Sequence, residues 1–335
     1  MSHVCGSRTP RVEVGLEPIH AMSTMSGSYG NTPGGQHGDR EMCVMRPAWV
    51  DERLFPFESH FAQINGAQVH YIDEGQGPVF LGLHGNPTWS FLYRHIVTAL
   101  KDRFRCIALD YPGFGLSEAP SGYRYTAAEH SSVVEGFVNV LGLQGTTMML
   151  HDWGGPIGLS VAARHPERFR ALVIGNTFGW PVNGDRTLER FSKLMGSDRP
   201  GRFLVERMDV FTKVLLPGGI KRKKLTKSEK AMYQGPHPTP ESRVPVHVLP
   251  GEILGAYELL TEVEQGLSQL ASLPALIVWG DRDQAFRESQ RLRWERTFPN
   301  HRTVILSGAS HYIPEDAPDE IVSAIRDWWP GTSDT

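Results

Sequence analysis

The stretch TMMLHDWGGPIGLSVAAR, residues 147–164, joins an apolar run to an amphipathic segment through a short glycine-containing link. Thr147 to Leu150 has the length and composition of a buried strand. Pro156 to Arg164 has the periodicity of a helix with one apolar face. The glycine pair at 154–155 lies between them, where a tight turn favours residues without a side chain. The segment therefore predicts a strand, a sharp turn and a helix, with Asp152 at the centre of the turn.

The same alternation continues on both sides of this segment. It predicts strands at Val79–Leu83, Cys106–Leu109, Ala171–Ile174, Ala275–Trp279 and Thr303–Leu306, and helices at Trp89–Leu100, His130–Leu141, Arg287–Thr297 and Asp319–Trp329. Strands that alternate with helices form a parallel sheet covered on both faces. Phe61–Ile64 and Ala67–Ile72 flank Asn65-Gly66, a dipeptide typical of a two-residue hairpin turn. We therefore expect an α/β fold with a mostly parallel, eight-stranded sheet and one antiparallel hairpin.

The alternation stops near Trp180 and resumes after about residue 270. The intervening residues are helical in pattern and basic, so we expect a helical cap at 180–270, inserted into a core of 46–179 and 271–335. Residues 1–45 are rich in Gly, Ser, Thr and Met and lack any periodicity. A segment of this kind buries too little surface to order itself, and we expect a disordered N-terminal extension.

The composition excludes several classes of protein. The chain has 335 residues, a formal net charge of −3 and 40% hydrophobic residues, enough for a large core in one or two domains. No window approaches the roughly 18 uncharged apolar residues of a membrane helix, and no secretory signal is evident. We therefore expect a cytoplasmic protein without a membrane partner. Cys5, Cys43 and Cys106 lack the spacing of a zinc site or a disulfide framework.

The charge is unevenly distributed. Residues 186–230 carry 13 Lys and Arg against 5 Asp and Glu. The run Lys221–Lys224 could contact a nucleic acid, but a nucleic-acid domain is usually basic throughout and carries groove-binding or aromatic motifs. We find no such motif, so we interpret the run as a solvated surface turn and expect no nucleic-acid partner.

Polar residues follow four of the expected strands at the point where each strand ends. The four segments are His84–Pro87, His151–Pro156, Gly280–Asp283 and Ser310–His311. The carboxyl ends of parallel strands meet at one edge of an open sheet, which is where ligands bind in such folds. We therefore expect these segments to form one site. Their order along the chain, nucleophile then acid then histidine, is the order of an α/β-hydrolase triad.

Asp152 occupies the position at which this kind of turn usually carries a nucleophilic serine. An aspartate suits attack on a saturated carbon, because its carboxylate displaces the leaving group and forms an alkyl ester that water can then hydrolyse. A serine would form an ether, which water does not cleave. Leu150 stands two positions before the nucleophile, where the generic motif carries a glycine. A turn that only packs the strand against the helix is the alternative, and the other three strand ends count against it.

The motifs His84-Gly85-Asn86-Pro87-Thr88-Trp89 and His151-Asp152-Trp153-Gly154-Gly155, with the closing His311, resemble those of the haloalkane dehalogenases. The resemblance covers about residues 47–329. It implies that water cleaves the carbon–halogen bond of a halogenated aliphatic compound to give an alcohol, a halide ion and a proton, without a cofactor or a metal. It further implies that Asp152 is the nucleophile, that His311 is the base, and that Asn86 and Trp153 bind the halide through side-chain N–H groups.

The chemistry of these side chains fits those roles. An amide and an indole N–H are hydrogen-bond donors that bring no negative charge to repel a halide. The displacement needs no proton transfer, so His311 is required in the second step, where it takes a proton from the attacking water. We expect the backbone N–H groups of Trp153 and Asn86 to stabilise the oxyanion that forms at the Asp152 carboxyl group. The expected partners are a small substrate, water and halide; no oligomeric state is predicted.

Two aspartates follow the seventh strand and compete for the role of acid. We prefer Asp283, because related dehalogenases and epoxide hydrolases place the acid fourth in a Gly-x-x-Asp turn. Asp281 fits a solvated turn, where aspartate is common for backbone reasons. The other location of the acid in the family, just after Ala171–Ile174, holds Asn176 instead of a carboxylate.

Several other residues near the site receive structural interpretations. His84 and His151 precede functional turns, and Trp89 begins a helix and is expected to pack. Aromatic residues of the cap are candidates to line an apolar substrate pocket, although aromatics at helical spacing more often belong to a core. They are Trp180, Phe191, Phe203, Phe211 and Tyr257.

Two alternative functions compete with dehalogenation. An epoxide hydrolase shares these motifs but protonates its leaving alkoxide, typically with two cap tyrosines, for which Tyr233 and Tyr257 are available. Asn86 disfavours that function, because epoxide hydrolases usually carry a bulky apolar residue there. A non-catalytic ligand sensor of the same fold is the second alternative. The complete set of two aspartates, a histidine and two halide donors counts against it.

Overall fold

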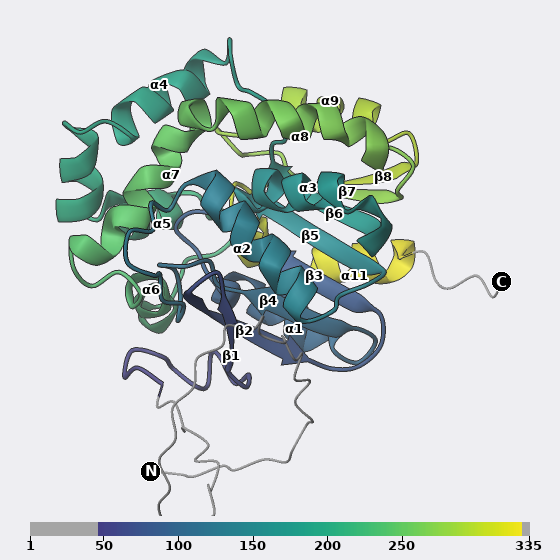
Figure 1. Cartoon of the computed structure of the whole chain (residues 1–335), viewed down its shortest axis with the longest axis horizontal. Helices are drawn as coiled ribbons and strands as arrows, with labels where there is room; N and C mark the ends of the chain where they lie inside the picture. Colours follow the sequence, from purple (N-terminus) through teal and green to yellow (C-terminus); the bar gives the residue numbers. More distant parts are fainter. Residues whose placement is uncertain (1–45, 330–335) are drawn as a thin grey trace, which may run out of the picture. The chain divides into compact units, whose positions relative to one another are not determined.

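Eight strands form one sheet in the computed structural model, which describes residues 46–329. Their order across the sheet is β1-β2-β4-β3-β5-β6-β7-β8 (Figure 1). The strands are β1 His60–Ile64, β2 Ala67–Glu74, β3 Val79–Leu83, β4 Arg105–Leu109, β5 Thr146–Asp152, β6 Phe169–Thr177, β7 Ala275–Gly280 and β8 His301–Leu306. The expected extension at 1–45 lies outside the described residues.

The first two strands form the predicted hairpin. β1 pairs antiparallel with β2, and the turn residues Asn65 and Gly66 have positive φ angles of 52° and 81°. β2 also pairs antiparallel with β4, whereas all pairings from β4 to β8 are parallel. The predicted mostly parallel, eight-stranded sheet is confirmed.

Strand side chains alternate between two apolar cores, one on each face of the sheet. On β5, Met148 and Leu150 enter one core and Met149 enters the other. The first core lies under α2 Ala127–Val140, α3 Gly154–Arg164, α8 Tyr257–Leu270 and α9 Glu288–Thr297. The second lies under α1 Arg94–Leu100, α10 Ile313–Asp316 and α11 Pro318–Trp328. Both faces of the strands are therefore covered, which is why these strands are continuously apolar in sequence.

The chain between β6 and β7, where the sequence predicts a cap at 180–270, forms a series of helices, and we keep the name cap for this region (Figure 1). They are α4 Arg186–Met195, α5 Leu216–Gly218, α6 Lys227–Gln234, α7 Val244–Gly255 and α8, together with two π-helices, Phe203–Arg207 and Phe211–Leu215. The expected helix at Trp89–Leu100 is divided, because Ser90–Tyr93 forms a 3₁₀ turn before α1 begins. Within residues 46–329, no helix is long and apolar enough to cross a membrane.

A buried cluster of charged side chains, which we call the anchor cluster, joins the cap to the core. Arg94 of α1 donates to Glu315 of α10 at 2.9 Å and to Glu229 of α6 at 3.0 Å. Tyr233 of α6 donates to Glu315, and the Lys223 ammonium lies 2.6 Å from the same carboxylate. Burial raises the pKa of Glu315, but Arg94 and Lys223 outweigh it and hold the pKa below its usual value. Lys223, one residue of the basic run at 221–224, is therefore half-buried and paired with a buried carboxylate instead of fully solvated.

Candidate active site

The turn after β5 holds Asp152 in a strained backbone conformation. Its φ angle is 51°, a left-handed value that non-glycine residues seldom adopt. Close packing explains the neighbouring glycines: a Cβ on Gly154 would lie 2.1 Å from the Leu83 carbonyl oxygen, and one on Gly85 would lie 2.1 Å from Asp152 Oδ1. Leu150, the departure from the generic motif, is buried within β5, so the turn obtains its room from the glycines that follow Asp152.

The Asp152 carboxylate faces two different groups with its two oxygens. The backbone N–H of Asn86 donates to Oδ1 at 2.7 Å, and Oδ2 lies 3.6 Å from Nε2 of His311. Burial raises the pKa of Asp152; the charge of His311 and the backbone N–H groups of Trp153 and Asn86 oppose this, and the net shift is upward. The two backbone N–H groups expected at an oxyanion thus already contact this carboxylate.

His311 bridges Asp152 and Asp283. Its Nδ1 lies 2.9 Å from Asp283 Oδ2, which leaves Nε2 facing Asp152. Burial lowers the pKa of His311, but the charge of Asp283, the hydrogen bond to it and the charge of Asp152 together raise it above the ordinary value. Burial raises the pKa of Asp283, and the His311 charge with three hydrogen bonds reverses this to a net decrease. Asp283 therefore keeps its negative charge although it is buried.

Asn176 is a residue of the site whose role the sequence did not reveal. Its Nδ2 donates to Asp283 Oδ2 at 2.8 Å, and its Oδ1 accepts from the Gly280 N–H at 2.8 Å. The signal was present, because Asn176 occupies the alternative location of the acid at the end of β6. Asp281 is exposed and accepts from the Gly308 N–H at 2.7 Å. Of the two aspartates after β7, Asp283 is thus the one that contacts His311.

The Asn86 side chain is held by the cap. Its Nδ2 donates to the backbone carbonyl of Val246 in α7 at 3.0 Å. That carbonyl is available because Pro250, four residues later inside the helix, has no N–H to donate to it. Asn86 Oδ1 is buried without a hydrogen-bond partner in the described part of the chain. The Val246 carbonyl can accept only from nitrogen, so it orients the Asn86 amide with Nδ2 toward α7. The second N–H of Nδ2 remains available.

Aromatic rings from strand ends form an apolar wall beside the triad. Trp153 is buried with its ring 5.1 Å from Phe178, which stacks on Phe286 at 5.4 Å, and Phe286 lies 5.6 Å from the His311 ring. Within residues 46–329, no acceptor contacts the Trp153 indole N–H. Sequence reasoning missed Phe178 and Phe286, although each follows a strand that ends at the site.

Of the five cap aromatics named from the sequence, three pack against other rings and two are exposed. Trp180 packs against Trp294 at 4.4 Å and donates to Gln290. Phe191 and Phe211 pack against each other, with ring centroids 6.2 Å apart. The remaining two, Phe203 and Tyr257, are exposed at the surface. These contacts assign Trp180 to the core and give no support to Phe203 or Tyr257 as pocket-lining residues.

The two histidines beside the site make fixed structural hydrogen bonds. His84 donates from Nδ1 to the Gly85 carbonyl and accepts at Nε2 from the Tyr111 N–H, and burial lowers its pKa to about 4. His151 donates from Nε2 to the His311 carbonyl at 2.8 Å, and burial lowers its pKa to about 3. Both rings are therefore neutral near pH 7. Trp89 is fully buried and donates to the Met232 carbonyl, in line with a packing role.

Neither tyrosine suggested for epoxide activation contacts the triad. The Tyr233 hydroxyl donates to Glu315 in the anchor cluster, and the Tyr257 side chain is half exposed. A pair of tyrosines that protonates a leaving alkoxide must point at the substrate above Asp152. This arrangement disfavours the epoxide hydrolase alternative.

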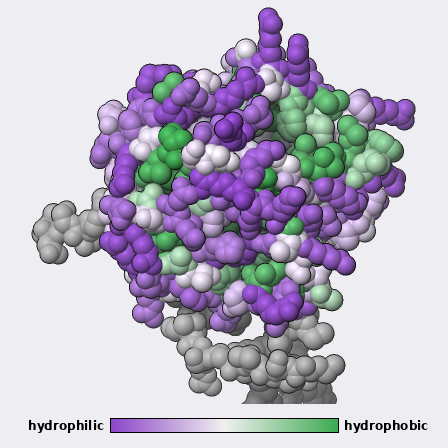
Figure 2. Space-filling model, turned by 180° about the vertical axis from the view of Figure 1, so that it is seen from behind, coloured by the Kyte–Doolittle hydropathy of each residue, from purple (hydrophilic) through white to green (hydrophobic). Residues whose placement is uncertain are grey.

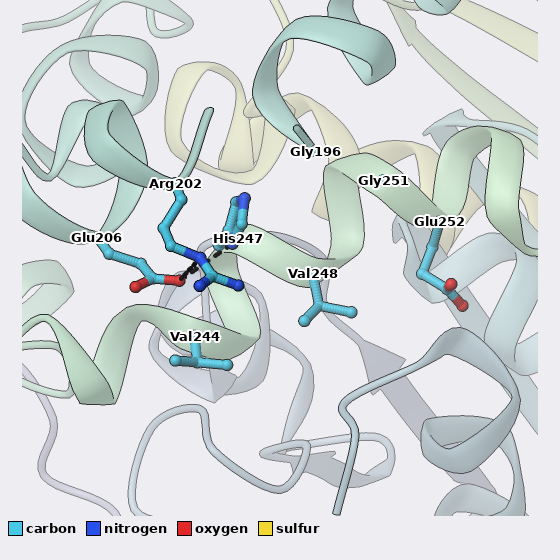
Figure 3. Close-up of a pocket in the computed structure, with 8 residues that line it drawn as sticks. All are labelled: Gly196, Arg202, Glu206, Val244, His247, Val248, Gly251 and Glu252. Carbon is cyan, nitrogen blue, oxygen red and sulfur yellow. Dashed lines mark ion pairs between the residues drawn. The ribbon is translucent and has the colours of Figure 1, made fainter. Parts of the chain in front are cut away.

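A cavity of about 400 Å³ lies in the cap between α4, the first π-helix and α7 (Figure 3). There the Glu206 carboxylate lies 3.0 Å from Nδ1 of His247 and forms an ion pair with Arg202 at 3.6 Å. Val244, Val248 and Gly251 of α7 line it, at the spacing of one helix face. Val246, which contacts Asn86, is on another face of α7, and no triad residue lines the cavity. Helix α7 therefore separates this cavity from the catalytic residues.

Comparisons with known proteins place the chain among hydrolases of one fold. Residues 78–318 match the family model described as the alpha/beta hydrolase fold. The chain is 43% identical over 277 residues to haloalkane dehalogenase 2 of Mycobacterium tuberculosis, covering 82% of this chain and 96% of that protein. The crystal structure of the haloalkane dehalogenase DatA from Agrobacterium tumefaciens matches with a TM-score of 0.72 at 26% identity, covering 81% of this chain and 95% of that one.

Two relatives carry a different activity in their names. The cis-3-alkyl-4-alkyloxetan-2-one decarboxylase of Shewanella oneidensis is 34% identical over 285 residues, covering 82% of this chain and 89% of that protein. Proteins with more than one reaction therefore share this sequence pattern, and the site must be considered with both kinds of substrate in view.

Proposed function

The chain belongs to the haloalkane dehalogenase family of α/β hydrolases, and from this premise we propose that it hydrolyses the carbon–halogen bond of a small halogenated aliphatic compound. The products are an alcohol, a halide ion and a proton. One observation carries the mechanism: Oδ1 of Asp152 accepts from the Asn86 N–H at 2.7 Å, while Oδ2 is directed toward His311 at 3.6 Å. The two oxygens of the nucleophile thus have different tasks.

In the first step, Asp152 Oδ2 attacks the carbon that bears the halogen. The new carbon–oxygen bond forms as the carbon–halogen bond breaks, and the bonding pair leaves with the halide. Asn86 Nδ2 and Trp153 Nε1 donate to the departing ion, one group from the loop after β3 and the other from the turn after β5. A preorganised donor aimed at developing negative charge contributes roughly 3 kcal/mol in a dry site.

In the second step, water hydrolyses the ester. His311 Nε2 accepts a proton from the water, whose oxygen attacks Cγ of Asp152, and negative charge develops on Oδ1. The N–H groups of Asn86 and Trp153 stabilise that charge, because the Asn86 N–H already donates to Oδ1 and the Trp153 N–H already bonds the same carboxyl group. Collapse of the intermediate breaks the ester carbon–oxygen bond, and the leaving alkoxide takes the proton from His311 to become the alcohol. The Asp152 carboxyl group then releases its remaining proton, which restores the carboxylate. Asp283 orients the His311 ring and stabilises its positive charge, and Asn176 holds Asp283 in turn.

Decarboxylation of an oxetan-2-one is a second candidate, favoured by the 34% identity to the Shewanella oneidensis enzyme. The first bond change would be the same: Asp152 displaces the ring oxygen from its saturated carbon and leaves a free carboxylate on the opened substrate. Loss of CO₂ then forms the carbon–carbon double bond. The ester bond to the substrate carbon breaks, and its electron pair returns to the Asp152 carboxylate. This route consumes no water and transfers no proton, so it does not use His311 as a base.

The decisive experiment traps the covalent intermediate. We expect His311→Phe, incubated with 1,2-dibromoethane, to release about one equivalent of bromide and to retain a 2-bromoethyl group on the peptide that contains Asp152. Mass spectrometry of the intact and digested protein measures this. His301→Phe is the matched control, because His301 is exposed on β8, and it should turn over normally. An adduct on any other residue, or no adduct together with no bromide, would contradict the proposal.

The same variant separates the two candidate activities. With a cis-3,4-dialkyl oxetan-2-one, His311→Phe would keep forming the alkene if decarboxylation is the native reaction, whereas its dehalogenation would stop after one turnover. Alkene measured by gas chromatography and bromide measured in parallel give the answer. A protein that forms neither product but binds an apolar compound tightly would instead be a ligand sensor.

A further inference from the structure

The cap carries an unusual concentration of exposed apolar side chains. Four of the eight large apolar residues exposed within residues 46–329 lie between positions 194 and 214. They are Leu194, Phe203, Met208 and Val214, with exposed fractions from 47% to 59%. Scattered exposed apolar residues need no explanation, but a group in one short segment does.

Each of these residues directly follows an exposed basic residue. The four pairs are Lys193-Leu194, Arg202-Phe203, Arg207-Met208 and Lys213-Val214. The first π-helix aligns two of them: the Met208 N–H donates to the Phe203 carbonyl five residues earlier, which places these two pairs one π-turn apart. Figure 2 shows hydrophobic surface gathered among hydrophilic residues at the upper right, on the side of the molecule that carries α4.

The exposed charge of residues 186–215 is more positive than the total charge of the segment, because most of its carboxylates are at least partly buried. All seven Lys and Arg of residues 186–215 are exposed, whereas Asp198 is the one fully exposed carboxylate among four. Glu189 and Glu206 are half-buried and Asp209 is buried. Arg190, Arg199 and Arg207 form no ion pair within residues 46–329. A partner would therefore meet positive charge and apolar side chains together. We call this surface the cationic apolar face.

The cationic apolar face is not needed for the internal packing of the cap. The opposite sides of the same helices are buried through Leu188, Met195, Val205 and Phe211. The segment therefore has one apolar side for the core and a second that faces outward. The catalytic mechanism uses no residue of this outward side.

We propose that the cationic apolar face docks on the surface of a membrane that contains anionic phospholipid. Apolar side chains enter the boundary between headgroups and acyl chains while neighbouring Lys and Arg meet the phosphates. A second copy of the chain fits less well, because a twofold interface would bring the same cations face to face. A nucleic acid would neutralise the cations but leave the aliphatic side chains without partners.

This proposal goes beyond the proposed function and does not depend on it. The expectation of no membrane partner rested on the lack of an apolar segment long enough to span a bilayer, and peripheral docking needs no such segment. Docking would place the cap against the phase in which apolar halogenated compounds concentrate.

The test is sedimentation of the full-length protein with vesicles. We expect binding to vesicles of phosphatidylcholine with phosphatidylglycerol, much weaker binding to phosphatidylcholine alone, and a decrease as salt rises. Leu194→Ser/Met208→Ser/Val214→Ser should weaken binding at least tenfold. Arg207→Gln alone should weaken it about fivefold, the contribution of one cation near an anionic surface. Val140→Ser/Ile305→Ser, at exposed positions outside the cap, is the matched control and should bind like the unmodified protein.

Bromide release from a water-soluble bromoalkane and the melting temperature should stay unchanged in the triple variant, which shows that it is folded and active. Equal binding of the triple variant and the control would overturn the proposal, as would failure to bind anionic vesicles. Light scattering that reveals a dimer abolished by the triple variant would assign the face to a second copy. Co-sedimentation with an acidic protein and not with vesicles would likewise reject the lipid surface.

Discussion

Asn86 lies between two regions of the molecule that are held in place in different ways. Its backbone N–H contacts Asp152 at the end of β5, and its side-chain amide contacts the Val246 carbonyl in the cap. The contact with Asp152 belongs to the first region, the strand ends, where the sheet itself holds each turn in place. The contact with Val246 belongs to the second region, the cap. It joins residues 160 positions apart in the chain and depends on the missing N–H of Pro250.

The difference teaches that the two halves of the reaction depend on different parts of the fold. In the proposed mechanism, bond formation and ester hydrolysis use groups positioned by β3, β5, β7 and β8. The proposed halide donors are Trp153, which lies in the strand-end region, and Asn86, whose side chain contacts the cap. Changes at the strand ends should therefore affect chemistry, and changes in the cap should affect halide affinity and stability.

The largest expected effect is at the strand ends. Asp283→Asn removes the charge that holds His311, so we expect turnover to fall roughly 10² to 10⁴-fold while the first release of bromide persists. Burst kinetics of bromide release measure both phases. Asp281→Asn is the matched control at an exposed position of the same turn and should retain full activity. Loss of activity in the control, or full turnover in Asp283→Asn, would reject the assignment of the acid.

The next effect concerns the junction of cap and core. Arg94→Met leaves Glu315 buried without its main partner, and we expect a loss of roughly 3 to 5 kcal/mol in the free energy of unfolding. Urea denaturation measures it. Arg105→Met breaks the part-buried pair with Asp73 and should cost at most about 1 kcal/mol. Similar losses in both variants would mean that the anchor cluster contributes no more than a surface pair.

A smaller effect tests the cap side of Asn86 directly. Pro250→Ala supplies an N–H that competes for the Val246 carbonyl, so we expect bromide affinity to fall about fivefold, the worth of one ordinary hydrogen bond. Quenching of Trp153 fluorescence by bromide measures the dissociation constant. Pro245→Ala, in the first turn of α7, changes the same residue type where the added N–H does not compete for the Val246 carbonyl, and should leave the affinity unchanged. Unchanged affinity in Pro250→Ala would show that Asn86 is oriented without the cap.

The smallest expected effect is a shift in the pH dependence of ester hydrolysis. In the free enzyme, Asp152 helps raise the pKa of His311. Alkylation removes the Asp152 charge, so the pKa of His311 should be lower in the ester intermediate. His311 acts as a base only when neutral, so hydrolysis is lost as the pH falls through that pKa. Single-turnover rates should therefore decline at a lower pH than the one at which NMR detects protonation of His311 in the free enzyme; coincident transitions would contradict this.

Much of the strand-end region could be predicted from the sequence because its information is local. Each polar segment directly follows an apolar strand, so the alternation that identifies the strands also places Asp152, Asp283 and His311 at one edge. Phe178 and Phe286 follow strands as well, but a phenylalanine near a core strand gives no local sign of which way its ring points. Asn176 was noticed, yet its bond to Asp283 joins two strand ends about 100 residues apart.

By itself, the sequence determined the α/β sheet and the order of its segments, and it predicts an aspartate nucleophile, because these depend on periodicity and on residue types at strand ends. Only the tertiary structure decided how the cap meets the core. Lys223, one of a basic run expected to be solvated, reaches a buried carboxylate, and the expected pocket aromatics Phe203 and Tyr257 are exposed. Helical periodicity gives a helix an apolar face, but long-range packing decides what that face will contact. Packing likewise decides which group bonds the Val246 carbonyl that Pro250 leaves free.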